Sequence, residues 1–223
     1  FGVKGYLSGD TGTQAGGWFK NELTGLADVQ GIRFRTPGLG GQVWAKLGAT
    51  VTNLAAGEIF AALQSGTLDA AEFVGPYNDL ALGFYQVAKN YYFPSFVEPG
   101  LATELVVSKS KLEELPPDLK ELVEICAQAS YDDVSSDMYA NDPRALHALV
   151  NEHGVKVHQF PEEIIEAGAK ASVELITEIR ESGDALTKEV AESFVSALSL
   201  LRERTEGTDM PFLAAREKYV RFD

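Results

Sequence analysis

The chain has 223 residues, 45% of them hydrophobic, and a formal net charge of -14. This size allows one large domain or two small ones with a buried core, while the acidic balance argues against nucleic acids and anionic membranes, which need concentrated Lys and Arg. The single Cys126 excludes an intrachain disulfide, and no stretch reaches the roughly 18 apolar residues of a membrane span.

The first predicted strand covers residues 3–7 and runs into a glycine-rich bend. The bend places the side-chain amide of Gln14 at the end of a strand. Its oxygen could serve a cation or satisfy a turn, and the surrounding glycines permit close approach of the backbone to another group.

The next predicted strand alternates between apolar and basic residues over 32–35. Arg35 stands at its end, shortly before a helix predicted over 42–47, whose amino end favours an anion. Arg binds a carboxylate through two parallel hydrogen bonds. We therefore expect Arg35 to hold a carboxylate and Arg33 to be an ordinary exposed residue.

Strands and helices then alternate at intervals of about 10 to 15 residues, the pattern of βαβ units in a largely parallel sheet. The predicted elements are a strand over 49–54, a helix over 57–65, a strand over 69–74 and a helix over 78–89. Glu72 is the last exposed residue of the third of these, beside the Gly75-Pro76 turn, where open α/β sheets bind ligands. Glu72 is thus the first candidate for chemistry, the alternative being a solvated acid at a strand end.

Beyond residue 100 the pattern changes to a strand over 102–107 and then to long helices. Glu104 is polar within that apolar strand, so its side chain either faces a cleft or lies on the solvent-exposed face of the strand. A helix is predicted from Pro117 to about Glu152 and a brief extended segment over 155–160.

Apolar residues at helical spacing then continue from Ile164 to Leu201. An unbroken helix of this length would span roughly 60 Å, more than one small domain. Unless Ser182-Gly183-Asp184 breaks it, we expect part of its apolar stripe to contact another lobe or another subunit.

Four motifs follow one another along the chain: TQAGGWF at 13–19, GIRFR at 31–35, GEIFAALQSG at 57–66 and EFVGPYND at 72–79. In this order and spacing they resemble those of the extracytoplasmic solute-binding subunits of TRAP transporters (the DctP type). With the long carboxy-terminal helices, they are most similar to the branch that binds 2-oxo and 2-hydroxy acids with a metal ion. The resemblance covers essentially the whole chain.

The resemblance implies an α/β fold: a periplasmic-binding-protein-like lobe of type II with a parallel-rich sheet, plus long carboxy-terminal helices. The opening βαβ segments of the family's first lobe do not occur in this sequence, which begins at Phe1 without Met, so we expect a processed chain or part of a longer one. The implied segments are 1–13 (end of the first lobe and crossover), 14–102 (second α/β lobe), 103–130 (return to the first lobe) and 131–223 (helices that span the hinge and form a dimer).

For the substrate, the resemblance implies that Arg35 pairs with a carboxylate. The other implied substrate-binding residues are Gln14, Trp18, Phe73 and Tyr77. Phe73 stands where the family usually has Trp, and this change removes an indole N–H donor and reshapes the pocket.

For the metal, the resemblance implies ligation by the side-chain oxygens of Gln14 and Glu72 and by the backbone carbonyl of Phe73. Oxygen-only ligands are those that Na⁺ or Ca²⁺ prefers. Glu72 and a substrate carboxylate bring two negative charges against the positive charge of Arg35, so Na⁺ balances the site. Ca²⁺ would be favoured if Glu104 turned its carboxylate into the cleft as a further ligand.

The predicted function is therefore that of a periplasmic solute-binding subunit and not an enzyme. It would capture a small monocarboxylate such as pyruvate or lactate with a metal ion, deliver it to the TRAP membrane permease, and form a homodimer through its carboxy-terminal helices. Two alternatives stay open: an α/β enzyme that polarises a 2-oxo acid with a Mg²⁺-like ion, and a sensory ligand-binding domain.

Overall fold

The computed structural model describes residues 1–220, which fall into two compact units, Phe1–Ala171 and a smaller one that begins at Ser172. The larger unit contains every strand of the described residues. Its elements are β1 (Val3–Asp10), β2 (Gly17–Phe19), β3 (Arg33–Arg35), α1 (Gly38–Lys46), β4 (Thr50–Thr52), α2 (Ala56–Ser65), β5 (Ala70–Ala71), α3 (Pro76–Leu82), β6 (Asn90–Phe93), β7 (Ala102–Ser108), α4 (Lys109–Glu113), α5 (Pro117–Asn151), β8 (Lys156–Gln159) and the first part of α6 (Glu162–Ser182).

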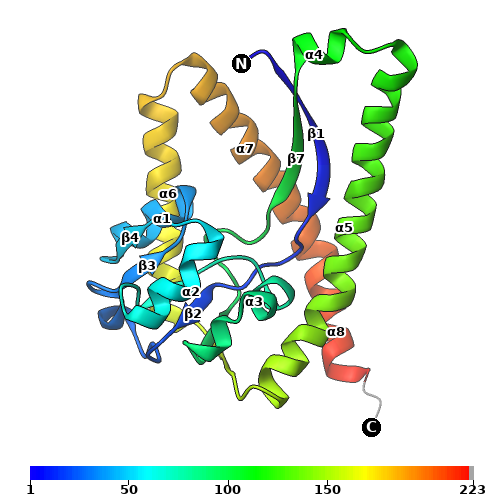
Figure 1. Cartoon of the computed structure of the whole chain (residues 1–223). Coiled ribbons are helices and arrows are strands. Elements are labelled where there is room, and N and C mark those ends of the chain that lie inside the picture. The colour runs from blue at the N-terminus through cyan, green and yellow to red at the C-terminus, as the bar shows by residue number, and fades with distance from the viewer. Residues whose placement is uncertain (221–223) are drawn as a thin grey trace. The chain divides into compact units, whose positions relative to one another are not determined.

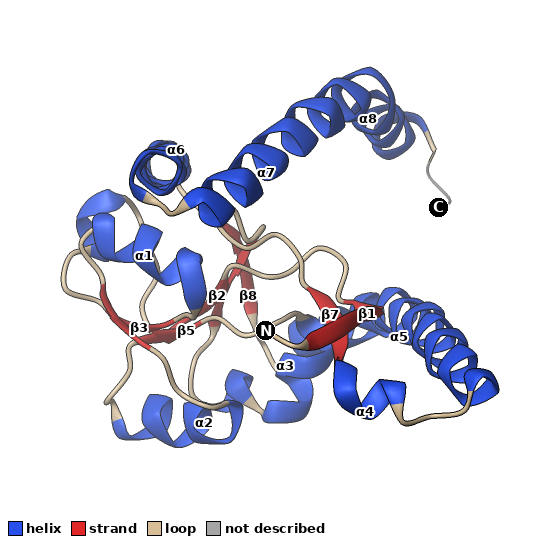
Figure 2. Cartoon of the chain, turned by 90° about the horizontal axis from the view of Figure 1, so that it is seen from above, coloured by secondary structure: helices blue, strands red, loops and turns tan. Residues whose placement is uncertain are grey.

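Six strands form one sheet in the order β4-β3-β5-β2-β6-β8. β3 runs parallel to both β4 and β5, and β6 runs parallel to β8, whereas β2 is antiparallel to its neighbours β5 and β6. Figure 2 shows α1 and α2 on opposite faces of this sheet. The predicted α/β class is confirmed, and the sheet is mixed because β2 enters its centre in the opposite direction.

The central strand β2 divides the core between the two faces of the sheet. Successive side chains of a strand point to opposite faces, so Trp18 stacks on Tyr91 with ring centroids 3.9 Å apart, while Phe19 contacts Phe34 at 5.3 Å and Trp44 at 6.2 Å. All five rings are buried. Burial of such side chains contributes ~1.5–3 kcal/mol each, which makes this sheet the stable support for the loops at its edge.

Outside the sheet, β1 and β7 form an antiparallel ribbon that lies along α5 (Figure 1). Two connecting segments join the ribbon to the sheet and are hydrogen-bonded to each other. Thr11 N donates to Leu101 O at 3.1 Å, and Gln14 N donates to Pro99 O at 2.9 Å. A Cβ added at Gly100 would lie 2.9 Å from Gly12 O, so the two connections approach as closely as glycine permits.

Two predicted elements around Glu72 are shorter in the structure. The strand predicted over 69–74 is reduced to β5, Ala70–Ala71. The helix predicted over 78–89 is wrong as a single element, because Gly83 adopts φ 74 and ends α3 before a 3-10 turn at Phe84–Gln86. Glu72 therefore lies in the irregular segment between β5 and α3.

In the smaller unit, the end of α6 is followed by α7 (Ala185–Arg204), a π-helical turn (Thr205–Asp209) and α8 (Met210–Tyr219). The predicted apolar stripe is broken at Ser182-Gly183-Asp184, where Asp184 caps α7 by accepting a hydrogen bond from Thr187 N at 2.8 Å. The helical run from Ala185 to Tyr219 would still extend about 50 Å.

Candidate functional site

Arg35 and Glu72 meet because their strands are parallel neighbours. Arg35 is paired with Ala71 in the sheet, and Glu72 N donates to Arg35 O at 2.9 Å. Arg35 Nη1 donates to the backbone carbonyl of Glu72 at 2.6 Å and lies 3.7 Å from Glu72 Oε2. With exposed fractions of 7% and 2%, the two side chains form a buried pair of ionisable groups at the end of β3 and just after β5.

Four buried side-chain oxygens make no well-formed hydrogen bond: Glu72 Oε1 and Oε2, Gln14 Oε1 and Thr36 Oγ1. Thr36 directly follows Arg35, and its side chain interacts with Glu72. An unsatisfied buried polar group costs ~1–3 kcal/mol. The amide of Gln14 is oriented by its Nε2, which donates to Thr11 Oγ1 at 3.0 Å, and Ala15 N donates to Val74 O at 2.9 Å. Gln14 is thereby held beside the segment that follows Glu72.

The electrostatics of Glu72 favour an added positive charge. Burial, with a contribution from the charge of Glu98, raises the pKa of Glu72 to about 8, although Arg35 opposes the rise. A carboxylate in this position is costly to ionise unless a cation or proton accompanies it. Carboxylate and amide oxygens are the donors that hard cations prefer, so Glu72 and Gln14 fit such an ion.

Glu98 is a second carboxylate near Arg35 that the sequence did not single out. It is half-buried, and burial raises its pKa while Arg35 opposes the rise. A Cβ added at Gly40 would lie 3.6 Å from Glu98 Oε2 and 3.8 Å from Thr36 Oγ1. Glu98 lies in an irregular loop, where no periodicity in the sequence predicts which way a side chain points. Its position follows from the pairing of that loop with the segment before Gln14.

The other predicted site residues lie in different surroundings. The ring of Phe73 is 5.7 Å from Arg35 Cζ. Trp18 is fully buried in the core, and Tyr77 is 37% exposed on α3. Glu104 is exposed on β7, opposite Leu7 of the ribbon.

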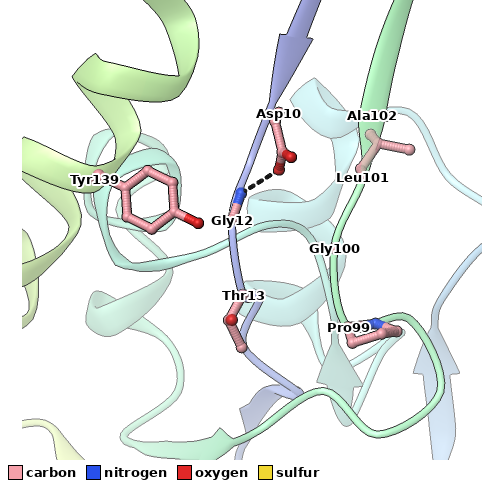
Figure 3. A pocket seen from close by; sticks show the side chains of 8 residues that line it. All are labelled: Asp10, Gly12, Thr13, Pro99, Gly100, Leu101, Ala102 and Tyr139. Atoms are coloured by element: carbon pink, nitrogen blue, oxygen red, sulfur yellow. Dashed lines mark hydrogen bonds between the residues drawn. The ribbon is translucent and has the colours of Figure 1, made fainter. Parts of the chain in front are cut away.

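A cavity of about 410 Å³ lies where the two connections pass α5 (Figure 3). Its lining residues are Asp10, Gly12, Thr13, Pro99, Gly100, Leu101, Ala102 and Tyr139. Asp10 Oδ1 accepts a hydrogen bond from the N–H of Gly12 at 2.7 Å. The cavity adjoins the site in sequence through Thr13 and Pro99, but neither Arg35 nor Glu72 lines it.

Within residues 1–220, no group of three or more His, Cys, Asp or Glu side chains could hold a metal ion. In the same part of the chain, none of the helices is long and apolar enough to cross a membrane.

Comparison with protein families matches residues 4–182 to the model described as bacterial extracellular solute-binding protein, family 7. A monocarboxylate 2-oxoacid-binding periplasmic protein of Nostoc sp. is 37% identical over 194 residues, which cover 87% of this chain and 53% of that protein. The chain thus spans about half the length of this curated relative.

Two solved structures are similar over nearly the whole chain. A TRAP periplasmic solute-binding protein from Pseudoalteromonas atlantica, with bound sodium and pyruvate, has a TM-score of 0.90 and 32% identity, covering 96% of this chain and 65% of that one. A TRAP transporter solute-binding protein from Bordetella bronchiseptica, a mixed-occupancy dimer with copurified calcium and picolinate, has a TM-score of 0.88 and 32% identity, covering 98% and 66%.

Proposed function

Because the chain belongs to the bacterial extracellular solute-binding protein family 7, we propose that it binds a 2-oxo acid such as pyruvate with a cation, in the periplasm, for delivery to a TRAP membrane permease. The family consists of solute-binding proteins and not enzymes, which agrees with the function predicted from the sequence. The relatives named above carry carboxylates with sodium or calcium, and this supports the choice of ligand.

The observation that carries the proposal is the buried Glu72 carboxylate, whose two oxygens accept no hydrogen bond although Oε2 lies 3.7 Å from Arg35 Nη1. Arg35 is oriented by donating Nη1 to Glu72 O and Nε to Leu54 O at 3.1 Å. Its remaining N–H groups can donate to the substrate carboxylate. Glu72, Gln14 and the backbone carbonyl of Phe73 would hold the cation, which supplies positive charge to the oxygens of a 2-oxo acid.

Calorimetry with pyruvate tests this function directly. We expect metal-stripped protein to bind pyruvate weakly in buffer free of Na⁺ and Ca²⁺, and tightly once either ion is added. Glu72→Gln should weaken binding strongly in the presence of the ion, because it removes the one charged ligand. Undiminished pyruvate affinity without any ion would refute the proposal.

The choice between the ions depends on Glu98. The sequence predicts Na⁺ if Glu72 is the only protein carboxylate in the site, and Ca²⁺ if Glu104 is a second one. In the structure Glu104 is exposed on the ribbon. Glu98, by contrast, interacts electrostatically with both Arg35 and Glu72. If Glu72, Glu98 and the substrate are all ionised, Ca²⁺ balances the site and Na⁺ leaves it one charge short. We therefore infer that calcium is favoured.

Glu98→Gln tests this inference, with Glu104→Gln as the matched control. We expect Glu98→Gln to lower pyruvate affinity measured in Ca²⁺ about tenfold more than in Na⁺, because a lost neutralising charge affects the divalent ion more. Glu104→Gln should change neither affinity. Equal effects of the two substitutions would assign no role to Glu98 in selecting the cation.

A further inference from the structure

Asp79 is a carboxylate enclosed in the aromatic core on the α3 side of the sheet, with 1% of its surface exposed. Its Oδ2 accepts hydrogen bonds from Trp18 Nε1 and from Tyr91 Oη, both at 2.8 Å. Its Oδ1 accepts one from Val74 N at 3.4 Å. The donors come from β2, from β6 and from the segment that follows Glu72, so one side chain joins the rigid sheet to the candidate site.

Burying a carboxylate at this position costs free energy. Burial is the main cause that raises the pKa of Asp79 to about 7, against the effect of its three donors. An apolar side chain of similar size would avoid the cost of burying a charge. An apolar residue could supply no acceptor for Trp18 Nε1, Tyr91 Oη or Val74 N. Of these three donors, Val74 N is the one that belongs to the segment of the candidate site. This N–H has no partner in the sheet ladder, because β5 ends at Ala71.

Val74 is also fixed from its other side, since its carbonyl accepts the N–H of Ala15 at 2.9 Å. Its amide therefore points at Asp79 and its carbonyl at the residue next to Gln14. Between β5 and Val74 lie Glu72 and Phe73, the residues that would offer oxygens to a cation. The direction of their side chain and carbonyl depends on where the chain is held at Val74.

We propose that Asp79 is a positioning residue that fixes Val74 and so aims Glu72 and Phe73 at the cation. This inference rests on the function proposed above. Asp79 itself is enclosed in the core, with 1% of its surface exposed, so its effect on the site passes through Val74. The stacked pair of Trp18 and Tyr91, with planes 16° apart, holds Asp79 in turn, so loss of either donor should loosen Val74.

Adjacent tyrosines of β6 provide a matched pair of variants. Tyr91 and Tyr92 are both buried, and each hydroxyl makes a short hydrogen bond, to Asp79 Oδ2 at 2.8 Å and from Leu23 N at 2.6 Å. Both Tyr91→Phe and Tyr92→Phe therefore remove one buried hydroxyl from the same strand. Only Tyr91→Phe alters the support of Val74, and Asp79→Asn alters it more directly.

Two measurements separate positioning from general destabilisation. Hydrogen exchange of the Val74 amide in ligand-free protein should be faster in Tyr91→Phe and Asp79→Asn and unchanged in Tyr92→Phe. Pyruvate affinity at saturating Ca²⁺ should fall about tenfold in Asp79→Asn, on the scale of one lost hydrogen bond to a charged group, and severalfold in Tyr91→Phe.

Equal affinities and equal exchange in Tyr91→Phe and Tyr92→Phe would overturn the proposal, as would wild-type values in Asp79→Asn. If Asp79→Asn does not fold, the tyrosine pair decides alone. Failure of the wild-type protein to bind pyruvate with any cation would instead count against the proposed function. The exchange of Val74 would still report whether Asp79 holds the segment.

Discussion

Arg33 and Arg35 are two residues apart on β3, and their surroundings differ. Arg33 is exposed and pairs with Asp69 through Nε at 2.7 Å and Nη2 at 2.6 Å, whereas Arg35 is buried beside Glu72. We expect Arg35→Ala to weaken pyruvate binding by at least ~2 kcal/mol, the scale of a desolvated charged hydrogen bond. Arg33→Ala should have little effect on binding. Calorimetric titration of both variants with pyruvate tests this expectation. Equal, small losses of affinity would contradict the assignment of Arg35 to the substrate carboxylate.

Glu72 should make the cation-free protein less stable as the pH rises. Its pKa in the folded protein is about 8 against an ordinary value of 4.5, so the folded state holds this proton more tightly than the unfolded state does. The stabilisation by this proton is complete below pH 4.5 and is lost as the pH rises toward about 8.

Thermal melts of metal-free protein between pH values of about 5 and about 8 test this expectation. The melting temperature should fall with rising pH, and Glu72→Gln should show a smaller fall. Part of the slope will remain in the variant, because the raised pKa of Asp79 acts in the same direction. Asp69, whose pKa is lowered by Arg33, acts only below this range. Identical slopes in wild type and Glu72→Gln would refute the assignment.

At the scale of elements, α3 is capped by another helix. Its own N-cap residue is Gly75, which offers no side-chain acceptor, and the N–H of Tyr77 instead donates to Asp142 of α5 at 2.9 Å. We expect Asp142→Ala to lower the free energy of unfolding by ~1 kcal/mol, as for other lost caps. Asp137→Ala on the same helix is the control, because Asp137 is exposed and bonds within α5, to Asn141. Urea denaturation measures both, and equal losses would argue against capping.

Elements with strong local signals could be predicted from the sequence. The helix expected over 57–65 is α2, and Gly66 ends it with φ 78. The neighbouring placement of Arg35 and Glu72 also follows from local reasoning, because both stand at the same end of adjacent parallel strands. The predicted end of the long helix near Glu152 matches α5, which ends at Asn151.

Elements that depend on distant partners could not be predicted. β2 has three residues, and its strand character comes from pairing with β6, more than 70 residues later. The break at Gly83 was hidden because apolar spacing continues through it. For the site, no sequence pattern marks Glu98 or Asp79. Glu98 lies in an irregular loop. Asp79 lies in a helix, and it is a buried acceptor only because donors from the distant strands β2 and β6 pack against it.

At the scale of the whole molecule, an exposed apolar stripe in the smaller unit follows one face of α7. Its side chains are 52% to 62% exposed and recur at helical spacing: Leu186, Val190, Phe194, Leu198 and Leu201. A contiguous exposed apolar stripe of this kind indicates an interaction surface. In a symmetric dimer the same stripe would serve both subunits, and the Bordetella relative is described as a dimer.

We therefore propose that the carboxy-terminal helices mediate a homodimer, and Phe194 is the residue to change. Sedimentation equilibrium should find a dimer at micromolar concentration, and Phe194→Asp should shift it to monomer, because a charge placed in an apolar interface must be desolvated without a partner. Ser196→Asp places the same charge two residues away, on the opposite face of the helix, and should leave the dimer intact. Circular dichroism should show unchanged helix content in both variants. A wild-type monomer at micromolar concentration with its helices intact would rule out this interface.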